Sequence, residues 1–146
     1  MKGVQFCILK VNTPAYTEMI ALRMKVLLGP IGIPPTYINP QKEADDILIG
    51  ACDGEQLIGC CILTQVNDQT VQLRQMAVDQ SLQQKGIGKE LIAFAENTAM
   101  ENGYRIVMMH ARDSVIPFYE KCGYTIAGGQ FFEVGIGHHK MQKTFS

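Results

Sequence analysis

The chain has 146 residues, of which 47% are hydrophobic and 18% are charged, and its formal net charge is -1 at pH 7. These values are typical of a soluble globular protein, and they exclude a basic surface for nucleic acid or for an anionic membrane. No apolar run approaches the roughly 20 residues that cross a bilayer. We therefore expect a cytoplasmic protein with a single domain over residues 1–146.

The five cysteines predict neither a disulfide framework nor a metal site. Their number is odd, and no C-x-x-C spacing occurs among them. Four of them lie in apolar runs typical of strands, where a free thiol behaves as a small hydrophobic group. For Cys122, packing is a simpler interpretation than a redox or acyl-accepting role.

The first predicted elements are a strand over residues 3–11 and a helix that begins at Thr13-Pro14. A hydroxyl residue followed by proline is a typical helix start. The segment GPIGIPPTYINP, residues 29–40, holds four of the six prolines, so it is either a connector or a loop over a site. The apolar face of the helix is predicted to consist of Tyr16, Ile20, Met24 and Leu27, up to Gly29.

Three antiparallel strands are predicted next, because Asp53-Gly54 and Asn67-Asp68 mark turns between apolar runs. Their expected ranges are roughly 46–53, 56–66 and 70–79.

A helix with one apolar face follows from Gly86 to about Asn102. The run RIVMMHA is typical of a strand buried on both faces. Ser114 is predicted to cap a short helix that ends at Gly123, and residues 123–134 and 136–144 are expected to form the last strands. The order β-α-connector-β-β-β-α-β-α-β-β predicts an α/β (α+β) domain with a mixed sheet.

Two glycines stand between a predicted strand and a predicted helix in QQKGIGKEL, residues 83–91. A helix N-terminus offers unpaired N–H groups and positive potential, and Gly86 and Gly88 lack the Cβ that would keep a pyrophosphate away from the backbone. Lys85 and Lys89 add positive charge. A plain turn is the alternative, since the spacing matches neither a P-loop nor a dinucleotide-binding fingerprint.

The segment LRQMAVDQSLQQKGIGKELI resembles the acetyl-CoA-binding segment of the GNAT superfamily of N-acetyltransferases. Its signature [QR]-x-x-G-x-[GA] is matched by Gln83, Gly86 and Gly88, after a strand that contains Met76 and Val78. The tail FFEVGIGHHKM is similar to a bacterial branch that ends in F-x-E-x-G-I-P-H-x-x-M. The segment VIPFYEKCGY resembles the family's F-Y-x-K-x-G-[FY] helix, matched by Phe118, Tyr119, Lys121, Gly123 and Tyr124.

The resemblance covers nearly the whole chain and implies a mixed, mostly antiparallel sheet that is splayed in the middle and flanked by helices. It implies transfer of the acetyl group from acetyl-CoA, as co-substrate, to the primary amine of a small molecule or peptide. The amine would attack directly in a ternary complex, without a metal. The family places acceptor selection in the loop after its first helix, here GPIGIPPTYINP, and is compatible with a homodimer.

The resemblance also assigns candidate site residues. The backbone amide of Val78 would polarise the thioester carbonyl, and Tyr119 would protonate the departing thiolate. The residues that would bind acetyl-CoA are Met76, Ala77, Val78, Gln83, Gln84, Lys85, Gly86, Ile87, Gly88, Lys89, Arg112 and Tyr119.

A base is needed because a free alkylamine, with a pKa of about 10, is mostly protonated at neutral pH. Many family members carry a glutamate on the strand before the glycine loop, where this chain has Arg74 and Gln75. The candidate bases are Glu133, His138 and His110, and a structural imidazole is the alternative role for each histidine.

Several interpretations compete at this stage. The missing strand glutamate favours a non-catalytic acyl-CoA-binding or regulatory module on the same fold, whereas a purely structural glycine turn would suit an interaction domain. Arg112 stands where the family often has an asparagine, and it either contacts a phosphate or is exposed. The acidic cluster of Glu43, Asp45 and Asp46 either attracts a cationic amine or is a solvated charge run.

Overall fold

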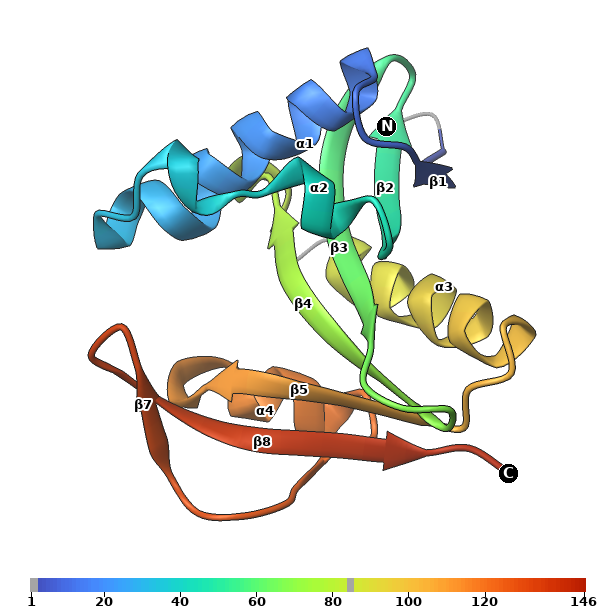
Figure 1. Ribbon diagram of the computed structural model, residues 1–146, viewed down its shortest axis with the longest axis vertical. Coiled ribbons are helices and arrows are strands. Elements are labelled where there is room, and N and C mark those ends of the chain that lie inside the picture. The colour runs from blue at the N-terminus through green and yellow to red at the C-terminus, as the bar shows by residue number, and fades with distance from the viewer. Residues whose placement is uncertain (1–2, 84–85) are drawn as a thin grey trace.

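One mixed sheet of eight strands organises the protein, as seen in a computed structural model that describes residues 3–83 and 86–146 (Figure 1). The strands are β1 (Gln5–Leu9), β2 (Ile47–Asp53), β3 (Gln56–Gln65), β4 (Thr70–Val78), β5 (Ile106–Arg112), β6 (Thr125–Ile126), β7 (Phe131–Glu133) and β8 (Ile136–Thr144). The α-helices are α1 (Pro14–Arg23), α2 (Pro40–Glu43), α3 (Ile87–Glu101) and α4 (Ile116–Lys121).

The sheet parts in its middle, between β4 and β5. The strand order is β1-β2-β3-β4-β5-β8-β6, with β7 paired to β8, and among the strand pairs of the described residues only β4 and β5 are parallel. These two strands pair over Thr70–Gln72 and Ile106–Met108 and then diverge, as Figure 1 shows. The splayed, mostly antiparallel sheet predicted from the resemblance is therefore confirmed.

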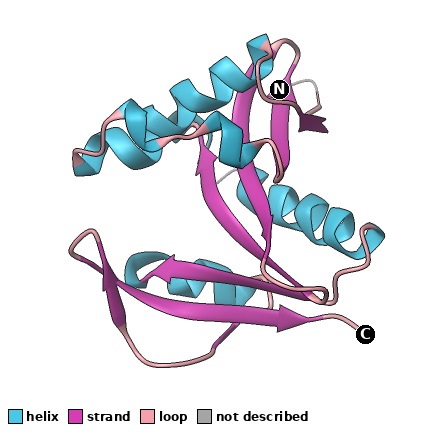
Figure 2. Ribbon diagram, viewed as in Figure 1, coloured by secondary structure: helices cyan, strands magenta, loops and turns pink. Residues whose placement is uncertain are grey.

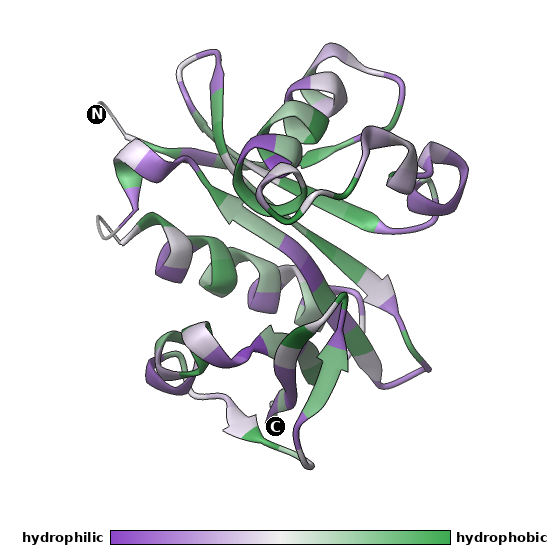
Figure 3. Cartoon of the chain, turned by 90° about the vertical axis from the view of Figure 1, so that its left-hand side faces the viewer, coloured by the Kyte–Doolittle hydropathy of each residue, from purple (hydrophilic) through white to green (hydrophobic). Residues whose placement is uncertain are grey.

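The helices cover both faces of the sheet (Figure 2). Residues of α3 pack with those of β3, β4 and β5 in one buried cluster, and α1 packs on β2 and β3 in a second one. Hydrophobic and hydrophilic residues alternate along the helices in Figure 3, as amphipathic packing requires. Within the described ranges, no helix is long and apolar enough to span a bilayer.

The first helix begins as predicted and continues differently. The Thr13 hydroxyl accepts a hydrogen bond from the Tyr16 amide at 3.2 Å, as an N-cap does. After Arg23 the chain widens into a π-helical turn, Met24–Leu28, that ends at Gly29. A Cβ on Gly29 would lie 2.5 Å from the Met24 carbonyl oxygen, so the turn requires glycine there. Of the predicted apolar face, Tyr16 is buried, and Ile20 and Leu27 are partly buried against the same cluster. The other buried residues of α1 are Met19, Leu22 and Arg23, which were not predicted.

Two further predictions near the C-terminus are wrong. Ser114 caps no helix: it lies in a 3-10 turn, and α4 begins after Val115 without a side-chain cap. The expected strand over 123–134 is two short strands, β6 and β7, because Gly128-Gly129 interrupts it and Gly128 has a φ of 129°. The strands expected at 46–53, 56–66 and 70–79 and the helix ending near Asn102 are confirmed.

The predicted acidic surface cluster is in fact partly a buried ion pair. Glu43 is 5% exposed and receives hydrogen bonds at 2.7–2.8 Å from both terminal nitrogens of Arg23, which is 0% exposed. The Tyr16 hydroxyl donates to the same carboxylate at 2.7 Å. The Arg23 Nε donates to the Gln75 side chain at 3.2 Å. The cluster thus joins α1, α2 and β4, and only Asp45 is exposed as predicted.

Candidate active site

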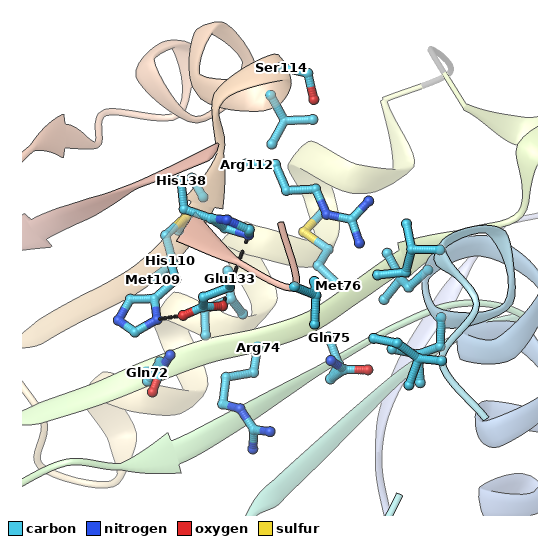
Figure 4. A pocket seen from close by; sticks show the side chains of 18 of the residues that line it. Gln72, Arg74, Gln75, Met76, Met109, His110, Arg112, Ser114, Glu133 and His138 are labelled. Atoms are coloured by element: carbon cyan, nitrogen blue, oxygen red, sulfur yellow. Dashed lines mark hydrogen bonds and ion pairs between the residues drawn. The ribbon is translucent and has the colours of Figure 1, made fainter. Parts of the chain in front are cut away.

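A cavity of about 630 Å³ opens where β4 and β5 separate (Figure 4). Its walls come from five parts of the chain: the π turn with the following proline-rich loop, β4, the end of β5, the 3-10 turn with α4, and the β7–β8 hairpin. These parts meet because the sheet does not close between β4 and β5. The predicted site strand, the proline-rich loop and the C-terminal hairpin therefore share one space.

The backbone of Val78 faces this opening. Antiparallel neighbours alternate between bonded and non-bonded pairs, and the Asp79 amide donates to the Ile58 carbonyl at 2.8 Å. The next pair, Val78 with Gly59, is therefore non-bonded, and the Val78 amide and carbonyl point away from β3. In agreement, the Gln83 side chain donates to the Val78 carbonyl at 3.0 Å. The Ala77 backbone, by contrast, pairs with Cys60.

A bulge in β4 precedes this exposed stretch. Gln75 and Met76 together stand opposite Cys61, between the pairs of Ile62 with Arg74 and of Cys60 with Ala77. Gln75 adopts a φ of 53°, which is uncommon for a residue other than glycine. A bulge of this kind bends its strand, and the buried Arg23 holds Gln75 by a hydrogen bond.

The two glycines of the loop have different roles. Gly86 is the N-cap of α3 with a φ of 82°, and a Cβ built on it would meet no atom within 4 Å. Gly88 is packed instead: its Cβ would lie 3.2 Å from Met76 and 3.3 Å from Phe118. The first intrahelical bond runs from the Glu90 amide to the Gly86 carbonyl, which leaves the amides of residues 87–89 unbonded within the helix. Gln84 and Lys85 lie outside the described residues.

Tyr119 on α4 lines the cavity. Its hydroxyl donates to the Met76 sulfur at 3.7 Å, and its ring packs edge-on against Phe118 and Tyr124. Burial raises the pKa of Tyr119 above the usual tyrosine value, so the hydroxyl stays protonated at neutral pH. A thioether is a weak acceptor, and a better one could replace it.

The three candidate bases form one cluster. Glu133 accepts from the His110 Nδ1 at 2.6 Å and lies 4.0 Å from the His138 Nε2, as the dashed lines in Figure 4 show. The His138 Nδ1 lies 2.7 Å from the Ile136 carbonyl oxygen, which can only accept, so this nitrogen carries the proton. The lone pair of a neutral His138 is therefore on Nε2, the nitrogen facing Glu133.

Gly137, which replaces the proline of the similar bacterial segment, makes room for polar side chains. A Cβ on Gly137 would lie 2.7 Å from both the Asp113 carboxylate and the Gln130 amide. Asp113 accepts from Gln130 at 2.6 Å and pairs with His139 at 2.7 Å. His139 is next to His138 on β8 and so points to the opposite face of the sheet.

The remaining predicted residues divide between the cavity and its surroundings. Arg112 lines the cavity, and Figure 4 shows its guanidinium projecting inward from the end of β5. Ile87, the first residue of α3, is buried, whereas Lys89 in the same helical turn is exposed. The hairpin residue Val134 and the apolar residues of the π turn line the cavity and were not predicted from the sequence.

Comparisons with known proteins agree with this architecture. The family model described as the acetyltransferase (GNAT) family matches residues 17–124. YvbK, an uncharacterised N-acetyltransferase of Bacillus subtilis, is 36% identical over 97 residues, which is 60% of this chain and 63% of that protein. The chain spans 42–63% of the length of the first three curated relatives it matches, which is less than two thirds of each.

Solved structures show the same fold. A GNAT family acetyltransferase of Elizabethkingia anophelis with acetyl-CoA bound is 18% identical and has a TM-score of 0.78, over 99% of this chain and 100% of that one. An acetyltransferase of Bacillus subtilis in complex with CoA is 22% identical with a TM-score of 0.78, over 99% and 100% of the two chains.

Proposed function

Because the chain belongs to the acetyltransferase (GNAT) family, we propose that it transfers the acetyl group of acetyl-CoA to a primary amine by direct attack in a ternary complex. The observation that carries the proposal is the cavity between the separated strands β4 and β5. The Val78 amide faces the opening between these strands, and Tyr119 and the Glu133 cluster line the cavity. The proposed acid and base thus line one cavity, and Val78 lies two residues along β4 from Met76, which also lines it.

The described residues fit acetyl-CoA in two respects. The amides of Ile87, Gly88 and Lys89, which have no partner within α3, would form an anion site of the kind that holds a pyrophosphate. Gly86 keeps this approach open, since a side chain there would point into free space in front of the helix. The open edge of β4 at Met76 and Val78 would hydrogen-bond the amides of the pantetheine arm. Gln84, Lys85 and Arg112 complete the proposed contacts.

In the proposed reaction, the amine nitrogen bonds to the thioester carbon and the carbon–sulfur bond breaks. The Val78 amide donates to the carbonyl oxygen as negative charge develops on it. The Tyr119 hydroxyl donates its hydrogen to the departing sulfur in place of Met76, and the product is coenzyme A with a protonated thiol. The acceptor binds as an ammonium group and must lose one proton to a base before its nitrogen can attack. A second proton leaves the nitrogen after the attack, and exchange through solvent returns one proton to Tyr119.

We assign that base to Nε2 of His138. Its lone pair is fixed by the hydrogen bond from Nδ1 to Ile136. The 4.0 Å distance to Glu133 is too long for a direct hydrogen bond, so both atoms are left to bond one ammonium group that lies beside them. The Glu133 carboxylate would attract the protonated amine and stabilise the imidazolium that forms. His110 holds Glu133 in position at 2.6 Å.

The first experiment measures acetyl-CoA binding by calorimetry on the wild type, Gly86→Asp and Gly86→Asn. Both substitutions tolerate the positive φ of Gly86 and have the same shape, so they differ only in charge. We expect wild-type binding, a modest loss with asparagine, and at least about a 10-fold further loss with aspartate. If the wild type does not bind acetyl-CoA, the glycine loop is only a structural turn and the proposed acetyl transfer is wrong.

The second experiment measures turnover with a library of amines on the wild type and Tyr119→Phe. We expect about a 10²-fold lower kcat in the variant with unchanged acetyl-CoA affinity. Binding of acetyl-CoA without turnover of any amine would favour the alternative, a non-catalytic acyl-CoA-binding module.

A further inference from the structure

One side of the cavity has an apolar wall. It is built from the π turn and the proline-rich loop, and Figure 4 shows apolar side chains from this side facing Gln75 and Met76. A π turn is rare and frequently lies at a functional site. The residues of this wall are Leu27, Leu28, Ile31, Ile33 and Tyr37.

Val134, which also lines this cavity, is strained. It and Gly135 form the two-residue turn between β7 and β8, with φ values of 45° and 75°. This type of turn favours Asn-Gly, and a β-branched residue at positive φ is an outlier. Val134 is nevertheless a valine, and it is 65% exposed. Strain of this kind persists where the side chain has a function, and here the side chain gives the cavity an apolar edge.

The charges around the cavity do not suit a polycation. Of the described lining residues, Glu133 is the only carboxylate, whereas Arg74 and Arg112 carry positive charge. Arg74 donates to Thr64 at 3.2 Å and lies 3.9 Å from Asp46 outside the cavity. One carboxylate matches one ammonium group, and each further cation of the ligand would meet an arginine or an apolar side chain.

We propose that the acceptor is a primary amine with a single positive charge and an apolar body. The ammonium group lies at Glu133, and the body lies between the apolar wall and Val134, which is a specificity-determining residue. The inference rests on the proposed acetyl transfer and names the acceptor class of that site.

The test compares kcat/KM for 2-phenylethylamine, hexylamine, ethanolamine and spermidine, with calorimetric binding of each amine to the protein saturated with coenzyme A. The two apolar monoamines should exceed ethanolamine and spermidine by about 10- to 100-fold in both measurements. The binding measurement does not depend on turnover, so it tests the cavity separately from the reaction.

The variant that tests Val134 is Val134→Asn, with Val134→Gly as a second. Asparagine is similar in size and is the relaxed residue at this turn position, so we expect the melting temperature to rise. The KM for 2-phenylethylamine should rise about 10-fold, and the ratio of kcat/KM for 2-phenylethylamine to kcat/KM for ethanolamine should fall by a similar factor. If Val134 had only a structural role, its substitution would change the KM of every amine by the same factor. A variant that is more stable than the wild type would then show no increase in KM.

The outcomes separate the two proposals. Turnover of spermidine or ethanolamine equal to that of the apolar amines overturns the acceptor class and leaves acetyl transfer in place. If apolar amines bind preferentially but are not turned over, the proposed ligand class of the cavity is supported and acetyl transfer is refuted. Unchanged selectivity in both Val134 variants removes the assigned role of this residue.

Discussion

Two acid–base clusters lie near the cavity, and they are built differently. The Arg23–Glu43 pair has side chains that are 0% and 6% exposed, with two parallel hydrogen bonds and further partners in Tyr16 and Gln75. The His110–Glu133 pair is 35% and 46% exposed. The first, which we call the inner cluster, is fully bonded and buried, whereas the second, the outer cluster, faces solvent and the cavity.

This difference in burial indicates which charged groups can exchange protons with a ligand. Every hydrogen-bonding group of a buried pair must be satisfied, because an unpaired buried charge is costly, and such groups are then not free to exchange protons with a ligand. The outer cluster keeps one carboxylate oxygen 4.0 Å from the His138 Nε2, a gap too wide for a direct hydrogen bond. We therefore expect the inner cluster to govern stability and the outer one to govern turnover.

The largest effect is expected from Glu43→Gln. The neutral amide leaves the Arg23 charge buried without its partner, so the free energy of unfolding should fall by about 3–5 kcal/mol in urea titrations. The double variant Arg23→Met with Glu43→Leu is the control, because it removes both charges and should recover much of the loss. A loss below about 1 kcal/mol for Glu43→Gln would contradict the structural role of the pair.

Glu133→Gln should show the reverse pattern. We expect kcat/KM to fall about 10²-fold while the free energy of unfolding stays within about 0.5 kcal/mol of the wild type. The matched control is His139→Gln, on the opposite face of β8, which should leave kcat/KM unchanged. Equal losses of activity in both variants would remove the distinction between the two faces.

The inner cluster should also make stability depend on pH. Burial opposes ionisation of Glu43, but hydrogen bonds from Arg23 and Tyr16 outweigh it and hold the pKa below the ordinary value of 4.5. A lowered folded-state pKa stabilises the fold at pH values above 4.5, and this contribution disappears as the pH falls through the folded-state value. Urea titrations over this range should therefore show a decline in the wild type that is smaller in Glu43→Gln.

The smallest effect concerns the bulge residue that the inner cluster holds. Gln75→Ala and Gln75→Gly both lose the hydrogen bond to Arg23, but only alanine retains a Cβ at a φ of 53°. The glycine variant should be more stable than the alanine variant by about 1 kcal/mol in thermal unfolding. Equal stabilities would indicate that the bulge relaxes once the side chain is removed.

Local chemistry explains what could be predicted from the sequence. Thr13-Pro14 starts a helix, and Asp53-Gly54 turns a hairpin, because each acts on its immediate neighbours. The glycine loop and Tyr119 were predicted from a resemblance to the family whose membership is now shown. Their roles in binding and catalysis stay predictions.

Contacts between distant residues explain what could not be predicted. Arg23 and Glu43 are 20 residues apart and meet only because the proline-rich loop returns α2 to the end of α1. Arg23 lies on the buried side of α1, but a charged residue is normally expected to be exposed, so its burial was not predicted. Val134 looked like part of a regular strand, since nothing in the sequence marks a valine as a turn residue.

The direction of the Val78 amide has a practical consequence. An amide that no strand partner protects exchanges its hydrogen with water far faster than its neighbours in a sheet. The flanking Ala77 and Asp79 amides are bonded across the ladder and serve as internal references. Hydrogen–deuterium exchange at this single residue therefore reports, without a label or an assay for turnover, whether an extended ligand has hydrogen-bonded to the middle of the sheet.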